Sequence, residues 1–183
     1  VDSVNKNQRR IAKAVNFGIV YGISGFGLSE NLDIPVNEAK KFIDDYLNAY
    51  PGIKEYMNKT IELAKENGYV KTLFNRKRNI PELANTNFMI REQGSRMALN
   101  TPIQGTSADI IKKAMVEIDK AFVHNGIKSK MLLQIHDELV FDVLEEEKQK
   151  VLDIVKTIME SVVNWEVPLK VSQDFGTDLY ETK

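Results

Sequence analysis

Apolar residues recur every three or four positions over most of the chain, the spacing that places them on one face of a helix. This pattern predicts amphipathic helices separated by short segments rich in glycine or proline. The predicted helices are residues 8–22, 35–50, 51–68, 87–100, 102–126 and 145–163. The first is expected to end in a turn marked by Gly22, Gly25 and Gly27, and Pro102 is expected to separate two helices.

A few segments depart from the helical period and predict β-strands. Residues 69–83 carry β-forming side chains on both sides of Asn75 and Arg76, which indicates a small hairpin. The other predicted strands are residues 131–135, 139–143 and 168–175. No repeat, low-complexity tract or linker interrupts the pattern, so the expected fold class is α/β of the α+β kind, dominated by helices.

Composition limits the classes of protein that fit the chain. It has 183 residues, of which 43% are hydrophobic and 28% charged, as in ordinary globular domains. Its 25 basic and 26 acidic residues nearly cancel, so any anion-binding site must be local. Cysteine is absent, which excludes disulfides and thiolate catalysis. There is no apolar run long enough for a membrane span, and we expect a soluble, unexported protein with no membrane partner.

The strand pair at residues 131–143 is interrupted by three polar residues, His136, Asp137 and Glu138. If the strands are antiparallel, this trio occupies the turn, where carboxylates stay in water or meet a cation. A simple polar turn is the alternative, because Asp is a common turn former. Since the flanking strands are apolar, the turn is expected to project from a buried sheet, and two adjacent carboxylates suit a hard cation such as Mg²⁺.

The first predicted helix carries charge of one sign. Residues 3–29 contain four basic residues and no acidic one. Arg9, Lys13 and Phe17 are four apart, so they drift by only about 40° per step and share one helix face. A triphosphate would relieve the repulsion between the two cations, and Phe17 and Tyr21 would then be placed to stack on a base or sugar. The alternative is a solvated basic face with both rings in the core.

These two segments resemble motifs of the family A DNA polymerases, the DNA polymerase I family. RRIAKAVNFGIVYG (residues 9–22) is similar to motif B, and QIHDELV (residues 134–140) is similar to motif C. GYVKTLFNRKRNIPEL (residues 68–83) and REQGSRMALNTPIQGTSADIIKKAM (residues 91–115) also resemble the family, in the same order. The resemblance covers essentially the whole chain and implies fingers helices with a partial palm that contains a small antiparallel sheet.

The resemblance implies part of a template-directed DNA polymerase, which adds deoxynucleotides to a primer 3′ end by two-metal phosphoryl transfer. Arg9 and Lys13 would hold the phosphates of the incoming deoxynucleoside triphosphate, and Lys13 would also assist the chemistry. Phe17 would pack on the sugar and base of this nucleotide. Tyr21 would lie at the template side of the pocket.

The resemblance also implies residues that hold metal and DNA. Asp137 would bind catalytic Mg²⁺ with support from Glu138, and His136 would lie near the primer terminus. Three further residues would contact the template–primer DNA: Arg96, Asn100 and Gln104. Without the resemblance these three would be interpreted as surface polar residues. The basic residues 76–78 fit either a phosphate contact or a solvated turn.

The family's motif A, a DYSQIELR-like segment with the second metal-binding Asp, does not occur in the chain. The resemblance therefore implies the C-terminal part of a polymerase domain, with fingers at about residues 1–85 and a partial palm at about 86–183. The isolated chain is predicted to be inactive and to self-associate through exposed palm surface. The parent enzyme is expected to serve DNA replication and repair in the cytoplasm. A non-catalytic nucleic-acid-binding or structural module that retains the fold is the alternative.

Overall fold

The computed structural model describes residues 4–182 and contains two compact units, Val1–Thr106 and Ser107–Lys183. Helices dominate both units, and each holds one two-stranded antiparallel sheet, as the sequence predicts. The boundary between the units lies inside a long helix. Within residues 4–182, no helix is long and apolar enough to cross a membrane.

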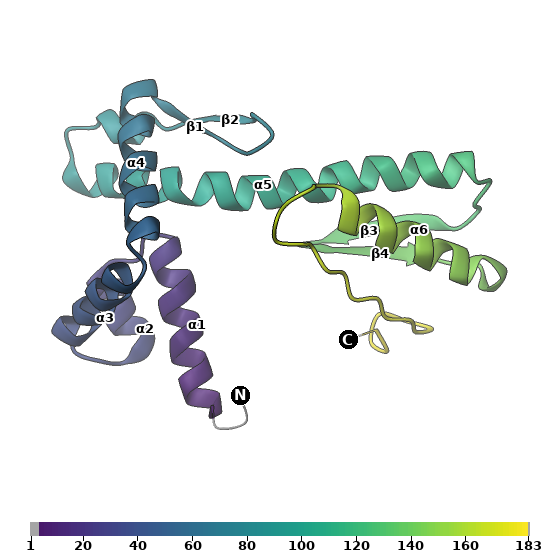
Figure 1. Cartoon of the computed structure of the whole chain (residues 1–183), viewed down its shortest axis with the longest axis horizontal. Coiled ribbons are helices and arrows are strands. Elements are labelled where there is room, and N and C mark those ends of the chain that lie inside the picture. The colour runs from purple at the N-terminus through teal and green to yellow at the C-terminus, as the bar shows by residue number, and fades with distance from the viewer. Residues whose placement is uncertain (1–3, 183) are drawn as a thin grey trace. The chain divides into compact units, whose positions relative to one another are not determined.

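The first unit consists of helices and one small hairpin (Figure 1). Its elements are α1 (Lys6–Val20), α2 (Gly25–Leu32), α3 (Val36–Ala49), α4 (Pro51–Asn67), β1 (Tyr69–Lys71), β2 (Lys77–Asn79), the 3₁₀ turn η1 (Pro81–Ala84) and the first part of α5 (Phe88–His124). The hairpin predicted around Asn75 is confirmed, and Asn75 adopts a positive φ of 63° in its loop.

The ends of α1 follow from local sequence. Asn5 begins the helix with a reciprocal capping box, and Gly22, with φ of 74°, follows its last turn. The expectation that Gly25 and Gly27 lie in the same turn is wrong, because both belong to α2. Ser24 caps that helix by accepting a hydrogen bond from the Gly27 backbone N–H at 3.1 Å, so a new helix begins three residues after Gly22.

Two apolar clusters hold the first unit together. One joins α1, α2 and α3 through the buried residues Leu28, Leu32 and Ala39. The other joins α4, the hairpin and α5 through Ala64, Val70, Ile80, Leu83 and Ala98. These clusters fix α1 and α5, the two helices that carry most of the candidate site residues.

The expectation that Pro102 separates two helices is wrong, because α5 runs continuously through it. Proline removes one backbone donor, but hydroxyl groups bond carbonyls of the same helix on either side. The Thr101 hydroxyl donates to the Met97 carbonyl at 2.7 Å, and the Thr106 hydroxyl donates to the Pro102 carbonyl. Burial of Ala98 on this stretch also favours continuation of the helix.

The second unit contains the remainder of α5, the hairpin of β3 (Lys130–Ile135) and β4 (Glu138–Asp142), the 3₁₀ turn η2 (Glu145–Glu147) and α6 (Lys148–Ser161). One face of the hairpin packs against the two helices. The buried centre of this cluster consists of Ala114, Ile118, Phe122, Val151 and Val155. Phe141 of β4 lies against Phe122, with ring centroids 5.9 Å apart.

Glu147 ties the start of β3 to the start of α6. Its carboxylate accepts hydrogen bonds from the Ser129 hydroxyl at 2.6 Å, the Ser129 backbone N–H at 2.8 Å and the Lys128 backbone N–H at 2.9 Å. The Ser129 hydroxyl also accepts from the Leu144 backbone N–H at 3.1 Å. The bond from the Ser129 hydroxyl, followed by the bond from Lys128, holds the pKa of Glu147 below its ordinary value.

The strand predicted at residues 168–175 is wrong, because that segment has no regular secondary structure. Its polar groups bond to α6 instead. The Val171 backbone N–H donates to Glu160 at 3.1 Å, and the Gln173 side chain donates to the Leu152 carbonyl at 3.0 Å. Because these partners lie on a helix, the β-forming side chains of this segment do not produce a third strand.

Candidate nucleotide and nucleic-acid interface

The predicted nucleotide-binding residues occupy one exposed face of α1. Arg9 and Lys13 are exposed, and Phe17 is 54% exposed, which argues against a core position for this ring. The Phe17 ring is stacked on that of Tyr21, with centroids 6.4 Å apart and planes 25° apart. Arg9, Lys13 and Phe17 therefore follow one another on an exposed helix face, and the half-buried Tyr21 lies just past the end of the helix.

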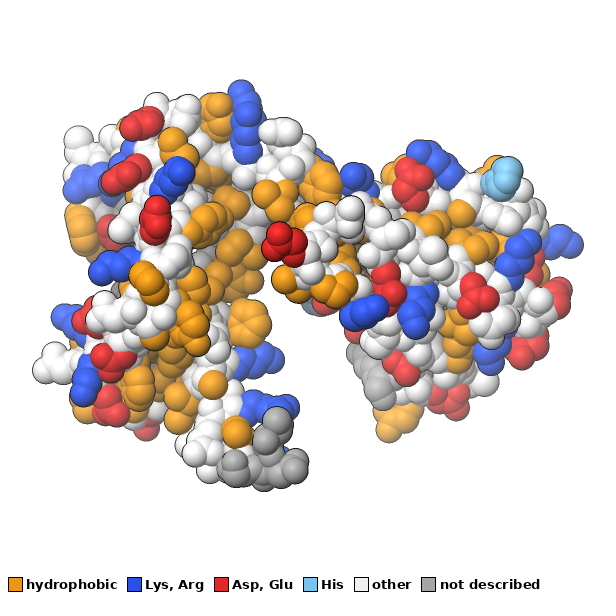
Figure 2. Space-filling model, viewed as in Figure 1, with side chains coloured by type: hydrophobic (Ala, Val, Ile, Leu, Met, Phe, Trp, Pro, Cys, Tyr) orange, Lys and Arg blue, Asp and Glu red, His pale blue; other side chains and the backbone are white. Residues whose placement is uncertain are grey.

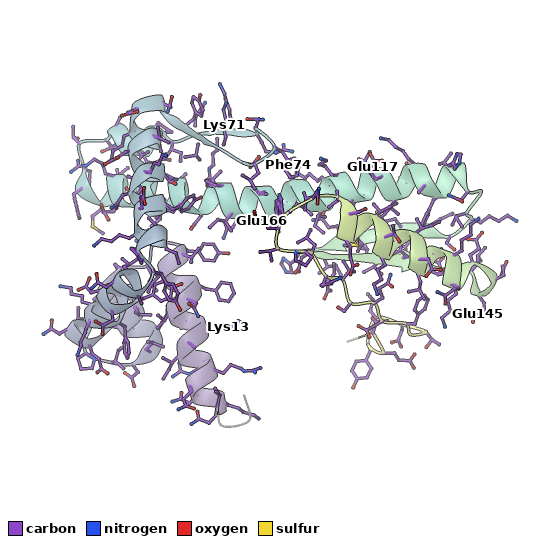
Figure 3. The ribbon with its side chains drawn as sticks, in the orientation of Figure 1. Lys13, Lys71, Phe74, Glu117, Glu145 and Glu166 are labelled. Atoms are coloured by element: carbon purple, nitrogen blue, oxygen red, sulfur yellow. The ribbon has the colours of Figure 1, made fainter. Side chains whose placement is uncertain are left out.

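A neighbouring arginine has a different role. The Arg10 guanidinium donates to the Asn31 carbonyl at 3.3 Å and to the Asn7 side chain at 3.2 Å, so it connects α1 to the end of α2. Within residues 4–182, neither Arg9 nor Lys13 has a carboxylate within ion-pair distance. Figure 2 shows Lys and Arg side chains along α1, and Figure 3 labels Lys13 on this helix. Arg9 and Lys13 thus retain charge for an anionic ligand.

The predicted DNA-binding residues follow one another on α5. Arg96 and Gln104 are exposed, and Asn100 is half-buried between them. The Asn100 Oδ1 atom is buried and lacks a hydrogen-bond partner among the described residues. The end of α1 packs here, since a Cβ atom built on Gly22 would lie 3.4 Å from the Arg96 Cγ atom. Tyr21 and Arg96 therefore belong to adjoining parts of one surface.

The predicted metal and primer residues lie at the β3–β4 connection. His136 and Asp137 form a two-residue turn, with His136 at a positive φ of 55°. Glu138 is the first residue of β4, opposite Ile135, and not part of the turn. The Gln134 side chain donates to the His136 carbonyl at 3.0 Å, which braces the turn. All three polar side chains are exposed, so the two carboxylates are accessible to a cation.

Asp137 and Glu138 supply oxygen donors, which fit Mg²⁺. They form an incomplete set, because no group of three or more His, Cys, Asp or Glu residues in the described part of the chain could hold a metal ion.

The sheet that carries this turn is less buried than expected. Met131, Leu139 and Phe141 pack toward the helices, but Leu133 and Ile135 of β3 are 51% and 38% exposed. The reason is that the sheet has only two strands within residues 4–182, so one face has no cover there. The turn projects from a sheet that is covered on one face and open on the other.

The structure groups the candidates by unit. Those on α1 and on α5 up to Gln104 belong to the first unit, and those at the β3–β4 turn belong to the second. The β1–β2 hairpin of the first unit is also basic, because residues 68–81 contain four basic residues and no acidic one.

Comparisons with known proteins identify the family of this chain. The family model described as DNA polymerase family A matches residues 1–181. The chain is 50% identical over 182 residues to DNA polymerase I of Streptococcus pneumoniae (strain ATCC BAA-255 / R6), 49% to that of Bacillus subtilis (strain 168) and 46% to that of Bacillus caldotenax. Each alignment covers 100% of this chain and 21% of the relative, so the chain spans about a fifth of the curated relatives it matches.

A solved structure has the same fold. It is the POL domain of Pol1 from M. smegmatis in complex with DNA primer-template and dNTP, with a TM-score of 0.89 and 40% sequence identity. The match covers 93% of this chain and 30% of that one. Because the family model covers nearly every residue and the relatives align along the full length, the chain belongs to the family A DNA polymerases.

Proposed function

We propose that this chain forms part of a DNA-directed DNA polymerase, which extends a primer with deoxynucleotides under the direction of a template. The observation that carries the proposal is the open face of α1, where Arg9, Lys13, Phe17 and Tyr21 lie in a row. The structural relative, which binds DNA primer-template and dNTP, supports these as the partners.

The proposed nucleotide site uses the α1 face. Arg9 and Lys13 bind the triphosphate, and the charge of Lys13 also stabilises the phosphates as they rearrange. Phe17 packs against the sugar and base, because an exposed ring loses apolar surface to water when a nucleotide covers it. Tyr21 lies next to the template base.

The proposed DNA site lies on α5 and at the β3–β4 turn. Arg96 and Gln104 donate hydrogen bonds to the template–primer in its minor groove, where such contacts test the shape of a base pair more than its identity. An ordered water bridges the buried Asn100 Oδ1 atom to the template–primer. His136 contacts the primer terminus. We assign residues from about 1 to 85 to fingers and those after them to a partial palm.

Asp137 and Glu138 are the proposed Mg²⁺ ligands of this chain. When bound, two Mg²⁺ ions activate the primer 3′-hydroxyl and neutralise the triphosphate and the leaving pyrophosphate. Asp137 donates its carboxylate oxygen directly, and Glu138, fixed in β4, supports the position of the turn. A further carboxylate from another segment of the polymerase completes the ligand set, so the isolated 183 residues are inactive.

The isolated chain is also proposed to self-associate. Leu132, Leu133 and Ile135 are 55%, 51% and 38% exposed on β3, and apolar strand surface of this kind promotes association. The full polymerase would act on DNA during replication and repair in the cytoplasm.

The test is primer extension by a chimera in which this chain replaces the matching segment of a related DNA polymerase I. Lys13→Ala should lower kcat/KM for the incoming nucleotide roughly 10- to 100-fold, since a hydrogen bond to a charged group contributes about 1.5–3 kcal/mol. Lys59→Ala is the matched control, because Lys59 is an exposed lysine on α4, away from the α1 face. Equal kcat/KM values for the two variants would contradict the proposal.

A further inference from the structure

The β1–β2 hairpin carries unbalanced positive charge at short range. Strand register places Lys71 directly opposite Lys77, and like charges in that position destabilise a hairpin. Both side chains are exposed, and within residues 4–182 no carboxylate lies within ion-pair distance of either one. Hairpin folding therefore brings two ammonium groups together without an anion between them.

The ammonium groups of both lysines lie over the ring of Tyr69. The Lys77 Nζ atom is 4.4 Å from the centroid of the Tyr69 ring, and the Lys71 Nζ atom is 5.8 Å from it. A ring face attracts cations and offsets part of their repulsion, typically by about 0.5–1 kcal/mol at exposed sites. The ring thus holds both ammonium groups on the same face of the hairpin, together with the exposed side chain of Asn79 opposite Tyr69.

The opposite face of the hairpin is fixed to α5. Val70 is buried, and the Arg78 guanidinium donates to the Thr101 hydroxyl at 3.1 Å. The Leu73 backbone N–H donates to the Thr106 hydroxyl at 3.0 Å. Figure 3 labels Lys71 on this hairpin, and Figure 1 shows the hairpin beside the first part of α5. The lysine pair is therefore mounted on a rigid support, which preserves its geometry for a ligand.

The support is the same stretch of α5 that carries the proposed DNA contacts. Thr101 directly follows Asn100, and Gly105, against which Thr72 of the hairpin packs, directly follows Gln104. The hairpin and the Asn100–Gln104 surface thus belong to one connected part of the first unit. The lysine pair lies on the outer face of a hairpin that is fixed to this stretch of α5.

We propose that Tyr69, Lys71 and Lys77 form a binding site for a phosphodiester of the DNA backbone, outside the nucleotide site. One phosphate accepts hydrogen bonds from both ammonium groups, and its attraction for the two cations outweighs the repulsion between them. Lysine acts as a point charge without base preference, so the contact adds affinity that is independent of sequence and sensitive to salt. The choice of DNA as the polyanion depends on the proposed function.

The test uses the full 183-residue chain and a fluorescent primer–template, with affinity measured by anisotropy between about 50 and 200 mM salt. Lys71→Gln/Lys77→Gln should reduce the magnitude of the slope of log K against log salt by about two, or about one per lost phosphate contact. Lys54→Gln/Lys59→Gln on α4 removes the same charge and should leave the slope almost unchanged. Equal effects of the two double variants, or undetectable DNA binding by the unmodified chain at low salt, would overturn the proposal.

A second variant separates binding from folding. Lys71→Glu replaces the like-charge pair with an opposite-charge pair, so the melting temperature of the chain should not fall while DNA affinity does. A loss of both would indicate a structural role for Lys71 and contradict the proposal. Deoxynucleoside triphosphate alone serves as the third probe, and its affinity should not change in Lys71→Gln/Lys77→Gln; a decrease would identify a nucleotide site instead.

The proposed function has its own readout. If Lys13→Ala lowers primer extension as expected but Lys71→Gln/Lys77→Gln leaves the salt slope unchanged, only the hairpin site is rejected. If Lys71→Gln/Lys77→Gln alters the salt slope but Lys13→Ala retains full activity, only the proposed nucleotide site is rejected.

Discussion

Replacement of Phe17 by Ala tests whether its ring contacts a ligand or belongs to the core. Phe17 is 54% exposed, whereas Ile19, two residues further along α1, is 1% exposed. Replacement of each residue by Ala should therefore have opposite consequences. Phe17→Ala should reduce nucleotide use while the fold persists, and Ile19→Ala should destabilise the fold.

The magnitudes follow from burial. Phe→Ala at a fully buried position costs about 3–5 kcal/mol, and less than half of the Phe17 surface is buried, so about 2 kcal/mol or less is expected. Part of this cost is the stacking with Tyr21, worth about 0.5–1.5 kcal/mol. Ile19→Ala should cost about 2–5 kcal/mol, since that side chain is fully buried. Loss of stacking on a base is worth about 1–3 kcal/mol, which corresponds to roughly 5- to 150-fold in kcat/KM.

Two spectroscopic probes together distinguish unfolding of the first unit from unfolding of the second. Urea unfolding followed by far-UV circular dichroism reports the helices of the whole chain, and Trp165, the single tryptophan, reports the second unit. Both substitutions lie in the first unit, so neither should move the fluorescence transition. Primer extension by the chimera gives kcat/KM. If Phe17→Ala destabilised the chain as much as Ile19→Ala, or if its kcat/KM matched that of the unmodified chimera, the assignment of Phe17 as a ligand-facing ring would be wrong.

Four further outcomes are expected. In the chimera, Asp137→Asn should abolish most primer extension while DNA binding persists, because an amide is a poor Mg²⁺ ligand; near-normal turnover would contradict the metal assignment. Phe17→Tyr should relax rejection of dideoxynucleotides, measured as the ratio of their incorporation to that of deoxynucleotides, and an unchanged ratio would place Phe17 away from the sugar. Purified residues 1–183 should give no primer extension with Mg²⁺ and four deoxynucleotides, and any extension that disappears with Asp137→Asn would refute this. Glu147 has a lowered pKa, so its stabilising effect is present above its ordinary value of 4.5 and is lost as the pH falls through the lowered pKa; Glu147→Gln should flatten this acid dependence of the Trp165 transition.

Local signals account for what the sequence predicts well. The helical period of α1, its Asn5 cap and the glycine after its last turn all lie within a few residues of one another. The two hairpins are likewise formed by neighbours in the chain. The spacing of Arg9, Lys13 and Phe17 follows directly once α1 is a helix.

Long-range contacts account for what the sequence does not predict. Whether Phe17 is exposed depends on which face of α1 the other helices cover, and spacing alone does not determine it. Pro102 is a helix breaker by propensity, but α5 runs through it, and burial of the preceding Ala98 and Leu99 favours the helix there. The Glu147 interaction with Ser129 joins residues 18 apart, and an acidic residue at a helix start has a simpler local explanation in the helix dipole.

Gly105 illustrates how a contact limits the mutational tolerance of this fold. Glycine inside a helix is less favourable than alanine by about 0.5–1 kcal/mol, so replacement of a helical glycine by alanine is ordinarily neutral or stabilising. At residue 105, however, a Cβ atom would lie 2.7 Å from the Cγ2 atom of Thr72, whose side chain is buried. Even alanine would push the hairpin away from α5. In a library with every substitution along α5, this position should be among the least permissive, although no side chain is present there to make a contact.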